Sequence, residues 1–361
     1  MEKTTEAELR QVLSGHRIKY PEMELTDTVK LIFQNEFGGG HLIADEAASL
    51  QWIRQEYESF QCSQHQWETP LWEAIGNGIY RLSLRCLEEG LAATTLNRMF
   101  AESAKQIHGS AAGFERKLEI LQEMDLPFTQ EEIETCLASY REKGYPPVSH
   151  SETYRQKYAP AYRVVMEPYR QAYPVCLAID RALSEKKDGQ DLTIAIEGCC
   201  GSGKSTLADI LSGIYDCNVF HMDDYFLRPE QRTEERYEQP GGNVDYERFR
   251  EEILLHLHEK QGLFQRAFAC RTLTLGEQIF VPHKRINIVE GAYSCHPYFG
   301  EGVYDLRFFV DCSEKVQTDR IRSRNGEEML QRFIDVWIPY ENKYFETFGI
   351  REKCIRVEMD L

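Results

Sequence analysis

The chain has 361 residues, of which 42% are hydrophobic and 28% are charged, and these values are typical of a globular protein rather than a disordered one. Its length predicts two domains. The net charge is −17, and residues 1–150 alone carry 14 Lys and Arg against 24 Asp and Glu. Because binding to nucleic acid needs a strongly basic surface, this balance argues against a nucleic-acid partner.

Two further features bear on the class of protein. The first residues lack the apolar segment of a secretory signal, and no apolar run is long enough to cross a bilayer. We therefore expect a cytoplasmic protein without a membrane partner. The eleven cysteines are odd in number and include no Cys-x-x-Cys pair, so neither a disulfide framework nor a structural zinc site is expected.

Residues 1–145 are predicted to form an all-α N-terminal domain. In residues 25–33, apolar side chains recur at helical spacing. Residues 129–140 open with a Thr-x-x-Glu capping box, which is typical of a helix start. Residues 69–91 also show an amphipathic pattern, which we interpret as another helix.

One unusual stretch precedes the linker. Three glycines at 38–40 stand before His41, and they can form either a ligand-binding turn or the C-cap of a helix; we favour the cap. Pro146 and Pro147 prevent a helix from continuing, so residues 146–190 are predicted to be a linker and a connecting helix.

Residues 191–361 alternate between apolar runs and helical patterns. Five short apolar runs predict the buried strands of a parallel sheet with helices on both faces, an α/β domain. They are residues 192–197, 217–222, 285–291, 306–312 and 354–359. Residues 264–281 alternate with a shorter period and predict a hairpin inserted before the third strand.

The first of these strands runs into "GCCGSGKS", residues 198–205, which satisfies the phosphate-loop pattern G-x-x-x-x-G-K-[ST] between a strand and a helix. Such a loop points successive backbone N–H groups at phosphate oxygens, and the helix N-terminus adds its positive end. We predict that Lys204 reaches the β- and γ-phosphates of ATP and that Ser205 ligates Mg²⁺. The predicted ATP-binding residues are Gly198, Cys199, Cys200, Gly201, Ser202, Gly203, Lys204, Ser205 and Thr206.

A kinase also needs a carboxylate that accepts the proton of the acceptor hydroxyl beside the γ-phosphate. In α/β folds this position lies at the carboxyl end of a neighbouring strand. Asp223 follows the second apolar run directly, although Asp223 and Asp224 could also be turn formers or helix caps. His221 and Trp337 are expected to be packed residues.

Four segments carry a resemblance to a known family. They are "HMDDYFLRP", "GGNVDYERF", "INIVEGAYS" and "RFIDVWIPYENKYF", and they resemble the uridine kinase and nicotinamide riboside kinase group of P-loop kinases over residues 190–358. The resemblance implies that Asp223 is the catalytic base and lies near the metal. It also implies that Asp245 holds ribose hydroxyls and that Glu290 organises Mg²⁺.

The chain departs from that group in its lid, which is dense in arginine in uridine kinases but holds only three arginines here, in residues 319–329. Of these, Arg320 and Arg324 are predicted to contact the γ-phosphate. Asp224 and Arg228 are predicted to join Asp245 in binding the substrate. The alternative for Asp245 is that it caps the helix starting at Tyr246.

These residues predict a kinase that uses ATP and Mg²⁺ to phosphorylate a hydroxyl of a nucleoside or similar small molecule. The alternative is a nucleotide-dependent switch or scaffold whose helical part binds a protein partner. Residues 1–145 could cover the acceptor site, form a homodimer or bind a regulator.

Overall fold

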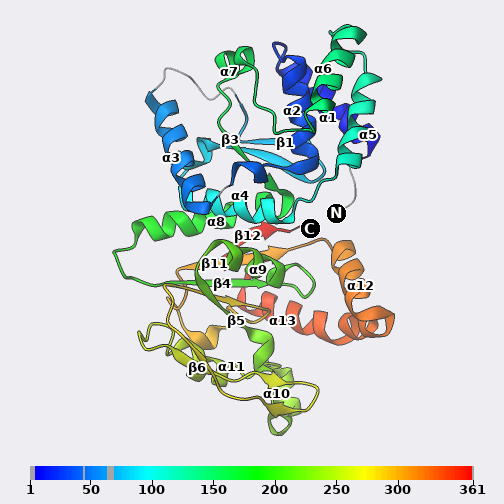
Figure 1. Ribbon diagram of the computed structural model, residues 1–361. Helices are drawn as coiled ribbons and strands as arrows, with labels where there is room; N and C mark the ends of the chain where they lie inside the picture. The colour runs from blue at the N-terminus through cyan, green and yellow to red at the C-terminus, as the bar shows by residue number, and fades with distance from the viewer. Residues whose placement is uncertain (1–4, 44, 63–68, 360–361) are drawn as a thin grey trace. The chain divides into compact units, whose positions relative to one another are not determined.

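The computed structural model describes residues 5–43, 45–62 and 69–359, and the chain forms two compact units (Figure 1). Unit 1 spans residues 1–170 and unit 2 spans residues 171–361. The division falls near the start of the helix α8 (Glu167–Glu185), inside the segment for which a linker and connecting helix were expected.

Unit 1 is mainly helical. Its helices are α1 (Glu6–Lys19), α2 (Leu25–Phe37), η1 (Gly40–Leu42), α3 (Glu46–Cys62), η2 (Leu84–Leu87), α4 (Ala93–Gln106), α5 (Ala111–Gln122), α6 (Gln130–Glu142) and α7 (Glu152–Tyr158). The helices predicted around residues 25–33 and 129–140 are confirmed as α2 and α6, and Thr129 and Glu132 form the expected capping box. Gly38 is the C-cap of α2, with its N–H donating to the Gln34 carbonyl at 2.9 Å.

Residues 69–91 were predicted to be helical, and this prediction is wrong. The broader prediction of a helical region before an α/β domain is confirmed. Strands β1 (Trp72–Gly76), β2 (Ile79–Ser83) and β3 (Tyr162–Met166) form an antiparallel sheet in that order. The turn between β1 and β2 is Asn77-Gly78, and both residues have positive φ (59° and 64°). Asn-Gly suits the tight turn of a hairpin because both residues tolerate positive φ, so this local signal outweighs the apparent helical period.

A buried carboxylate joins this hairpin to α1. Glu73 of β1 contacts Arg81 of β2 at 3.2 Å, and from α1 it contacts His16 at 3.3 Å and Lys19 at 2.7 Å. Burial acts to raise the pKa of Glu73, but these partners together hold it well below its usual range. A buried charge is tolerated when it is paired in this way, so the network makes the position of α1 dependent on the hairpin.

Unit 2 contains the predicted α/β domain. After α8 its elements are β4 (Leu192–Gly198), α9 (Lys204–Ile214), β5 (Cys217–His221), η3 (Met222–Tyr225), η4 (Pro229–Gln231), α10 (Glu234–Glu238), α11 (Tyr246–Phe249), η5 (Arg250–Leu254), β6 (Leu263–Gln265), β7 (Phe268–Ala269), β8 (Thr274–Leu275), β9 (Ile279–Val281), β10 (Ile286–Glu290), η6 (Pro297–Phe299), β11 (Leu306–Asp311), α12 (Glu314–Arg332), η7 (Phe333–Trp337), α13 (Ile338–Phe348), η8 (Arg351–Lys353) and β12 (Ile355–Glu358).

All five predicted strands are confirmed, and they form a parallel sheet in the order β12-β11-β4-β10-β5. Every residue of β4 and β10 is buried, as expected for strands covered on both faces. The chain passes from β4 to β5, returns to place β10 between them, and then continues on the other side of β4 with β11 and β12. This reversal marks the crevice at the carboxyl end of β4 as the place where α/β folds bind ligands.

Helices cover the sheet on both faces. Helix α9 packs on β4, β5 and β10. By register, Ala195, Val289 and Phe309 share one face, and these residues belong to a core cluster with side chains of α11 and α13. Within that cluster the ring centroids of Phe309 and Phe345 lie 5.1 Å apart. The predicted hairpin of residues 264–281 is also confirmed, as two short antiparallel pairs, β6 with β9 and β7 with β8.

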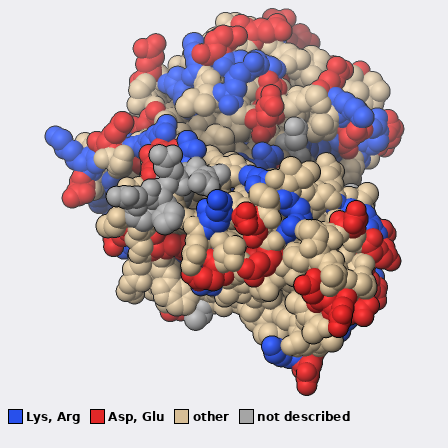
Figure 2. Space-filling view, turned by 90° about the horizontal axis from the view of Figure 1, so that it is seen from above, with Lys and Arg blue, Asp and Glu red and all other residues tan. Residues whose placement is uncertain are grey.

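The remaining sequence expectations concern charge, membranes and cysteines. Lys and Arg are interspersed with Asp and Glu on the face shown in Figure 2. Among the described helices, none combines the length and the apolar character that crossing a membrane requires. All eleven cysteines are free thiols.

Candidate functional site

Unit 2 contains a cavity of about 570 Å³ at the carboxyl ends of its central strands. One wall is the phosphate loop and the start of α9. Asp223 follows β5 and Glu290 ends β10, and both line the cavity. Further lining residues come from the segment from α12 to α13. They are Arg320, Arg324, Asn325, Met329, Phe333, Trp337 and Glu341.

The phosphate loop has the backbone that its glycines allow. Gly198 has φ of +148°, and a Cβ there would lie 2.2 Å from the carbonyl oxygen of Val310, so only glycine lets the loop leave the sheet at this point. Gly203 has φ of +105° and precedes the first turn of α9. Lys204 is buried, and its Nζ donates to the carbonyl oxygen of Cys199 at 2.8 Å. The loop therefore places Lys204 inside the phosphate-binding turn.

The residues predicted to hold Mg²⁺ include a contacting pair. The hydroxyl of Ser205 is 3.2 Å from each carboxylate oxygen of Glu290. Among the described residues, no group of three or more His, Cys, Asp or Glu is arranged to hold a metal. Mg²⁺ in phosphate-transfer sites needs only one or two protein ligands, because phosphate and water supply the rest. A serine hydroxyl beside one carboxylate therefore fits this ion.

His221 was predicted from the sequence to be a packed residue, but its side chain also makes a polar contact in the site. Its Nδ1 lies 2.5 Å from Oε1 of Glu290, and the side chain is about half exposed. The hydrogen bond to Glu290 raises the pKa of His221, whereas partial burial acts to lower it. Glu290 is therefore oriented from both sides, by Ser205 and by His221.

Asp223 shares this cavity with Lys204 and Glu290. Burial raises the pKa of its carboxyl; the charge of Lys204 acts in the opposite direction, and the charges of Glu290 and Asp224 raise the pKa further. A carboxylate with a raised pKa is a stronger base once it is ionised. Asp223 is thus placed where the sequence predicted a proton acceptor.

Asp224, Arg228 and Asp245 were predicted to bind the substrate. None of them is among the described residues that line the cavity. Asp245 caps α11: its Oδ1 accepts from the Arg248 amide at 3.1 Å, and its Oδ2 lies 3.6 Å from Nε of Arg228. The capping alternative is therefore what the structure shows for this side chain. Asp224 is half-buried, and its carbonyl oxygen accepts from Arg248 at 3.0 Å. Their roles in binding substrate stay predictions.

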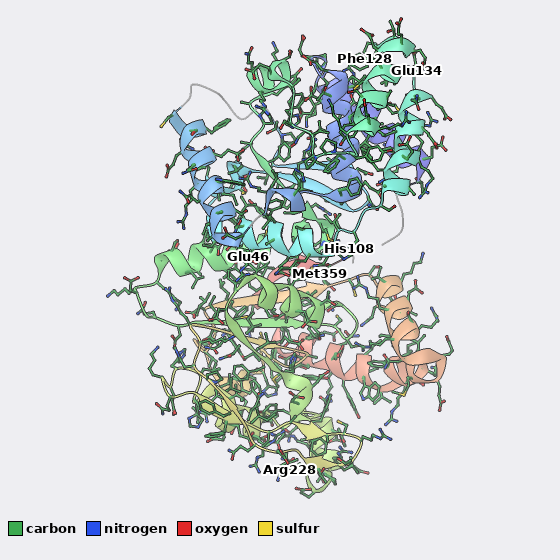
Figure 3. All side chains as sticks on the ribbon, in the orientation of Figure 1. Glu46, His108, Phe128, Glu134, Arg228 and Met359 are labelled. Carbon is green, nitrogen blue, oxygen red and sulfur yellow. The ribbon has the colours of Figure 1, made fainter. Side chains whose placement is uncertain are left out.

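Figure 3 labels one residue of unit 2 that lines the cavity, Met359, and one that does not, Arg228. Arg228 lies among the loops and short helices that follow β5, whereas Met359, just after β12, lies at the other end of the unit.

Both lid arginines line the cavity. Arg320 donates to the carbonyl oxygens of Ser202 at 3.0 Å and Met359 at 2.6 Å. Arg324 lies one helical turn further along α12, two residues before Gly326 interrupts the helix with φ of +81°. Their contact with a γ-phosphate stays a prediction.

Several residues that line the cavity were not predicted from the sequence. The cavity is also lined by Phe226, Asn243, Cys270, Tyr293, Phe333, Trp337 and Glu341. Four of the seven are aromatic, and Trp337, expected to be packed in the core, is one of them. Most belong to the segments that carry the family resemblance, but no spacing rule predicts which side chains in those segments face the cavity.

The least expected feature is Glu197, which is fully buried in β4 just before the phosphate loop. Its Oε1 accepts from the backbone N–H groups of Gly198 at 2.9 Å and Tyr293 at 3.1 Å. Its Oε2 accepts from the Cys295 N–H at 3.1 Å and the Tyr344 hydroxyl at 3.0 Å. Burial raises the pKa of Glu197 to about 7, and the amide donors act against this rise.

The Glu197 carboxylate explains an unusual backbone. Tyr293 has φ of +74°, and a bulky residue in this region costs about 1–3 kcal/mol unless its surroundings hold it there. The hydrogen bond from the Tyr293 N–H to Glu197 holds the backbone at this point. The same carboxylate therefore orients the first glycine of the phosphate loop and an aromatic side chain of the cavity wall.

Together, the strand order of the parallel sheet and the phosphate loop that follows its central strand decide the fold class. Unit 2 has the α/β fold of a phosphate-loop nucleotide-binding domain. No protein-family model and no curated protein matches the chain.

Among solved structures, the chain is similar to a candidate uridine kinase from Bacillus stearothermophilus, with 20% identity and a TM-score of 0.42 over 54% of this chain and 100% of that one. It is also similar to a candidate fructose transport system kinase from Silicibacter sp. TM1040, with 18% identity and a TM-score of 0.40 over 49% of this chain and 94% of that one. At this level of similarity, the function of the chain has to be inferred from its own residues.

The Glu197 interactions predict a stability effect. In Glu197→Gln, one of the two acceptor oxygens is replaced by an amide N–H₂ group. Each carboxylate oxygen accepts from two donors, so the new N–H₂ group faces two donors whichever way the amide is turned. An unsatisfied buried polar group costs about 1–3 kcal/mol. We expect the midpoint of urea unfolding to fall accordingly at an unchanged m-value. Glu301→Gln, at an exposed position, is the matched control, and equal midpoints for the two variants would contradict this account.

Proposed function

We propose that this protein is an ATP-dependent kinase that transfers the γ-phosphate to a hydroxyl group of a nucleoside or a similar small molecule. The observation that carries the proposal is that the carboxylate of Asp223 shares one cavity with Lys204 and Ser205 of the phosphate loop. A nucleotide-binding loop alone is common to many activities, whereas a carboxylate in the same cavity supplies the base that phosphate transfer to a hydroxyl requires.

The donor half of the site binds and polarises the phosphates. Backbone N–H groups of the loop and the start of α9 face the phosphate oxygens, and Lys204 adds a positive charge close to them. Arg320 and Arg324 of α12 offset the negative charge of the transferring group. Ser205 and Glu290 would hold Mg²⁺, which supplies further neutralisation of the phosphate charge when it is bound.

The acceptor half orients and deprotonates the hydroxyl. Asp223 accepts the hydroxyl proton while the acceptor oxygen forms its bond to the γ-phosphorus. The bond from this phosphorus to the bridging oxygen breaks, and ADP leaves with the bonding electrons. A water molecule in the position of the acceptor hydroxyl could also give its proton to Asp223 and attack the γ-phosphate. A bound acceptor must therefore displace this water.

The first test is Asp223→Asn. This variant keeps the shape of the side chain but cannot take up the proton, so turnover should fall by at least about 100-fold, while nucleotide affinity changes little. Acceptor-dependent ADP release across a panel of uridine, nicotinamide riboside, D-glucose and D-fructose, with the product mass, measures turnover. Binding of a fluorescent ADP analogue measures the affinity.

Asp188→Asn, at an exposed position, serves as the control. Retained turnover in Asp223→Asn would remove Asp223 from the role of base. ADP release that depends on no acceptor in the panel, but changes when a protein partner is added, would favour a nucleotide-dependent switch instead.

The second test concerns pH. The pKa of Asp223 is raised, and the base works only when ionised, so kcat/KM should be lost as pH falls, at a pH above that of an ordinary aspartate. The negative charge of Asp224 contributes to this rise. Asp224→Asn should therefore lower the pKa of Asp223 and move the acid limb of the profile to lower pH. A limb that stays in place or moves to higher pH would show that another group controls it.

A further inference from the structure

The cavity is lined by a further carboxylate besides Asp223 and Glu290, namely Glu341 of α13, which is buried and only 6% exposed. Its Oε2 accepts from the backbone N–H of Cys200 in the phosphate loop at 2.8 Å. Burial raises the pKa of Glu341; the charge of Lys204 acts to lower it, and the charge of Asp223 raises it. These interactions place Glu341 within electrostatic reach of both the phosphate-binding lysine and the base.

The cations that line the cavity are Lys204, Arg320 and Arg324. Lys204 points into the phosphate loop, and Arg320 is bound to the carbonyl oxygens of that loop. Two other arginines near the acceptor side are already engaged with backbone. Arg232 donates to the Leu227 carbonyl oxygen at 3.0 Å, and Arg248 donates to that of Asp224 at 3.0 Å. Arg324, which also lines the cavity, contacts Asn325 at 2.9 Å and is predicted to contact the γ-phosphate. An anionic acceptor would therefore meet two carboxylates, while the lining cations would already be paired with the phosphate loop or with the γ-phosphate.

The rest of the acceptor wall is apolar or neutral. Tyr293, Phe333 and Trp337 line it with ring surface, and the rings of Phe333 and Trp337 pack edge to face at 4.5 Å between centroids. The side chain of Asn243 is hydrogen-bonded to Tyr293. Such a wall suits a flat or apolar part of a ligand, and aromatic faces also attract cations.

We propose that Glu341 determines which acceptors bind, by accepting a hydrogen bond from a hydroxyl or ammonium group of a neutral or cationic acceptor and by repelling anionic ones. This inference rests on the proposed kinase function and narrows its substrate class. Acceptors that already carry a carboxylate or a phosphate near the reacting hydroxyl are disfavoured, because a third negative charge would lie beside Asp223 and the buried Glu341.

The test compares acceptors that differ mainly in charge. One set is nicotinamide riboside, uridine and orotidine, which are cationic, neutral and anionic nucleosides. The other is D-glucosamine, D-glucose and D-glucuronate. In whichever set is phosphorylated, kcat/KM for the anionic member should be at least about tenfold below that of the neutral member, since a hydrogen bond to a charged group changes binding about 10- to 100-fold.

Three variants of the full chain separate the roles of Glu341. Glu341→Gln should raise the KM for neutral and cationic acceptors by about 10- to 100-fold with little change in kcat, and should narrow the difference from the anionic acceptor. Glu341→Asp keeps the charge and should keep the discrimination against anions. Glu346→Gln, at an exposed position of the same helix, should behave as the parent protein.

Binding of a fluorescent ADP analogue distinguishes selection of the acceptor from support of the loop. If Glu341→Gln weakens nucleotide binding and leaves the acceptor KM unchanged, Glu341 only holds the Cys200 amide and the inference is overturned. Equal use of anionic and neutral acceptors by the parent protein also overturns it. Both results leave the kinase function intact, whereas the absence of phosphorylation of any acceptor in either set would count against the kinase function itself.

Discussion

The candidate site depends on one buried carboxylate. Glu197 accepts four hydrogen bonds, from the start of the phosphate loop, from two amides after β10 and from α13. A carboxylate without partners at this depth would be strongly unfavourable, and satisfying it requires all three segments to be in place. The donor loop, the strained backbone of Tyr293 and the helix that carries Glu341 are thus oriented by the same group. Phosphate transfer needs such coordination, since donor and acceptor must be held within a few tenths of an ångström of the reacting geometry.

The strand order explains why these segments meet. The sheet places β10 and β11 on either side of β4, and parallel strands end at the same edge. Residues that are 85 positions apart, such as Ser205 and Glu290, therefore come into contact. The outward faces of the sheet are covered by helices, so the edge is the part of the unit that can open into a cavity.

The cavity also combines charges of both signs. Its lining includes the cations Lys204, Arg320 and Arg324, the carboxylates Asp223, Glu290 and Glu341, and aromatic rings. Such a combination suits a reaction in which a highly charged donor meets a neutral or cationic acceptor. The raised pKa values of Asp223 and Glu341 follow first from burial, so the shape of the cavity and its acid–base chemistry have a common physical origin.

What could be predicted from the sequence was carried by local patterns. The phosphate loop, the five strands and the capping box of α6 each depend on residues close together in the chain, and the structure confirms them. The Asn77-Gly78 turn was equally local, but it was overlooked because the surrounding apolar residues also fit a helical period. The position of Asp245 before a helix indicated a capping role, but the sequence did not decide between this role and substrate binding.

The sequence by itself determined the elements of unit 2, the phosphate loop and the position of a carboxylate after β5. Only the tertiary structure decided that Glu341 and the aromatic wall face this carboxylate, that Asp245 is occupied as a helix cap, and that Glu197 joins the two halves of the site. The physical reason is that hydrogen-bonded turns, caps and strand periodicity act over a few residues. Burial and the pairing of charges depend instead on contacts between residues far apart in the chain, which exist only in the folded protein.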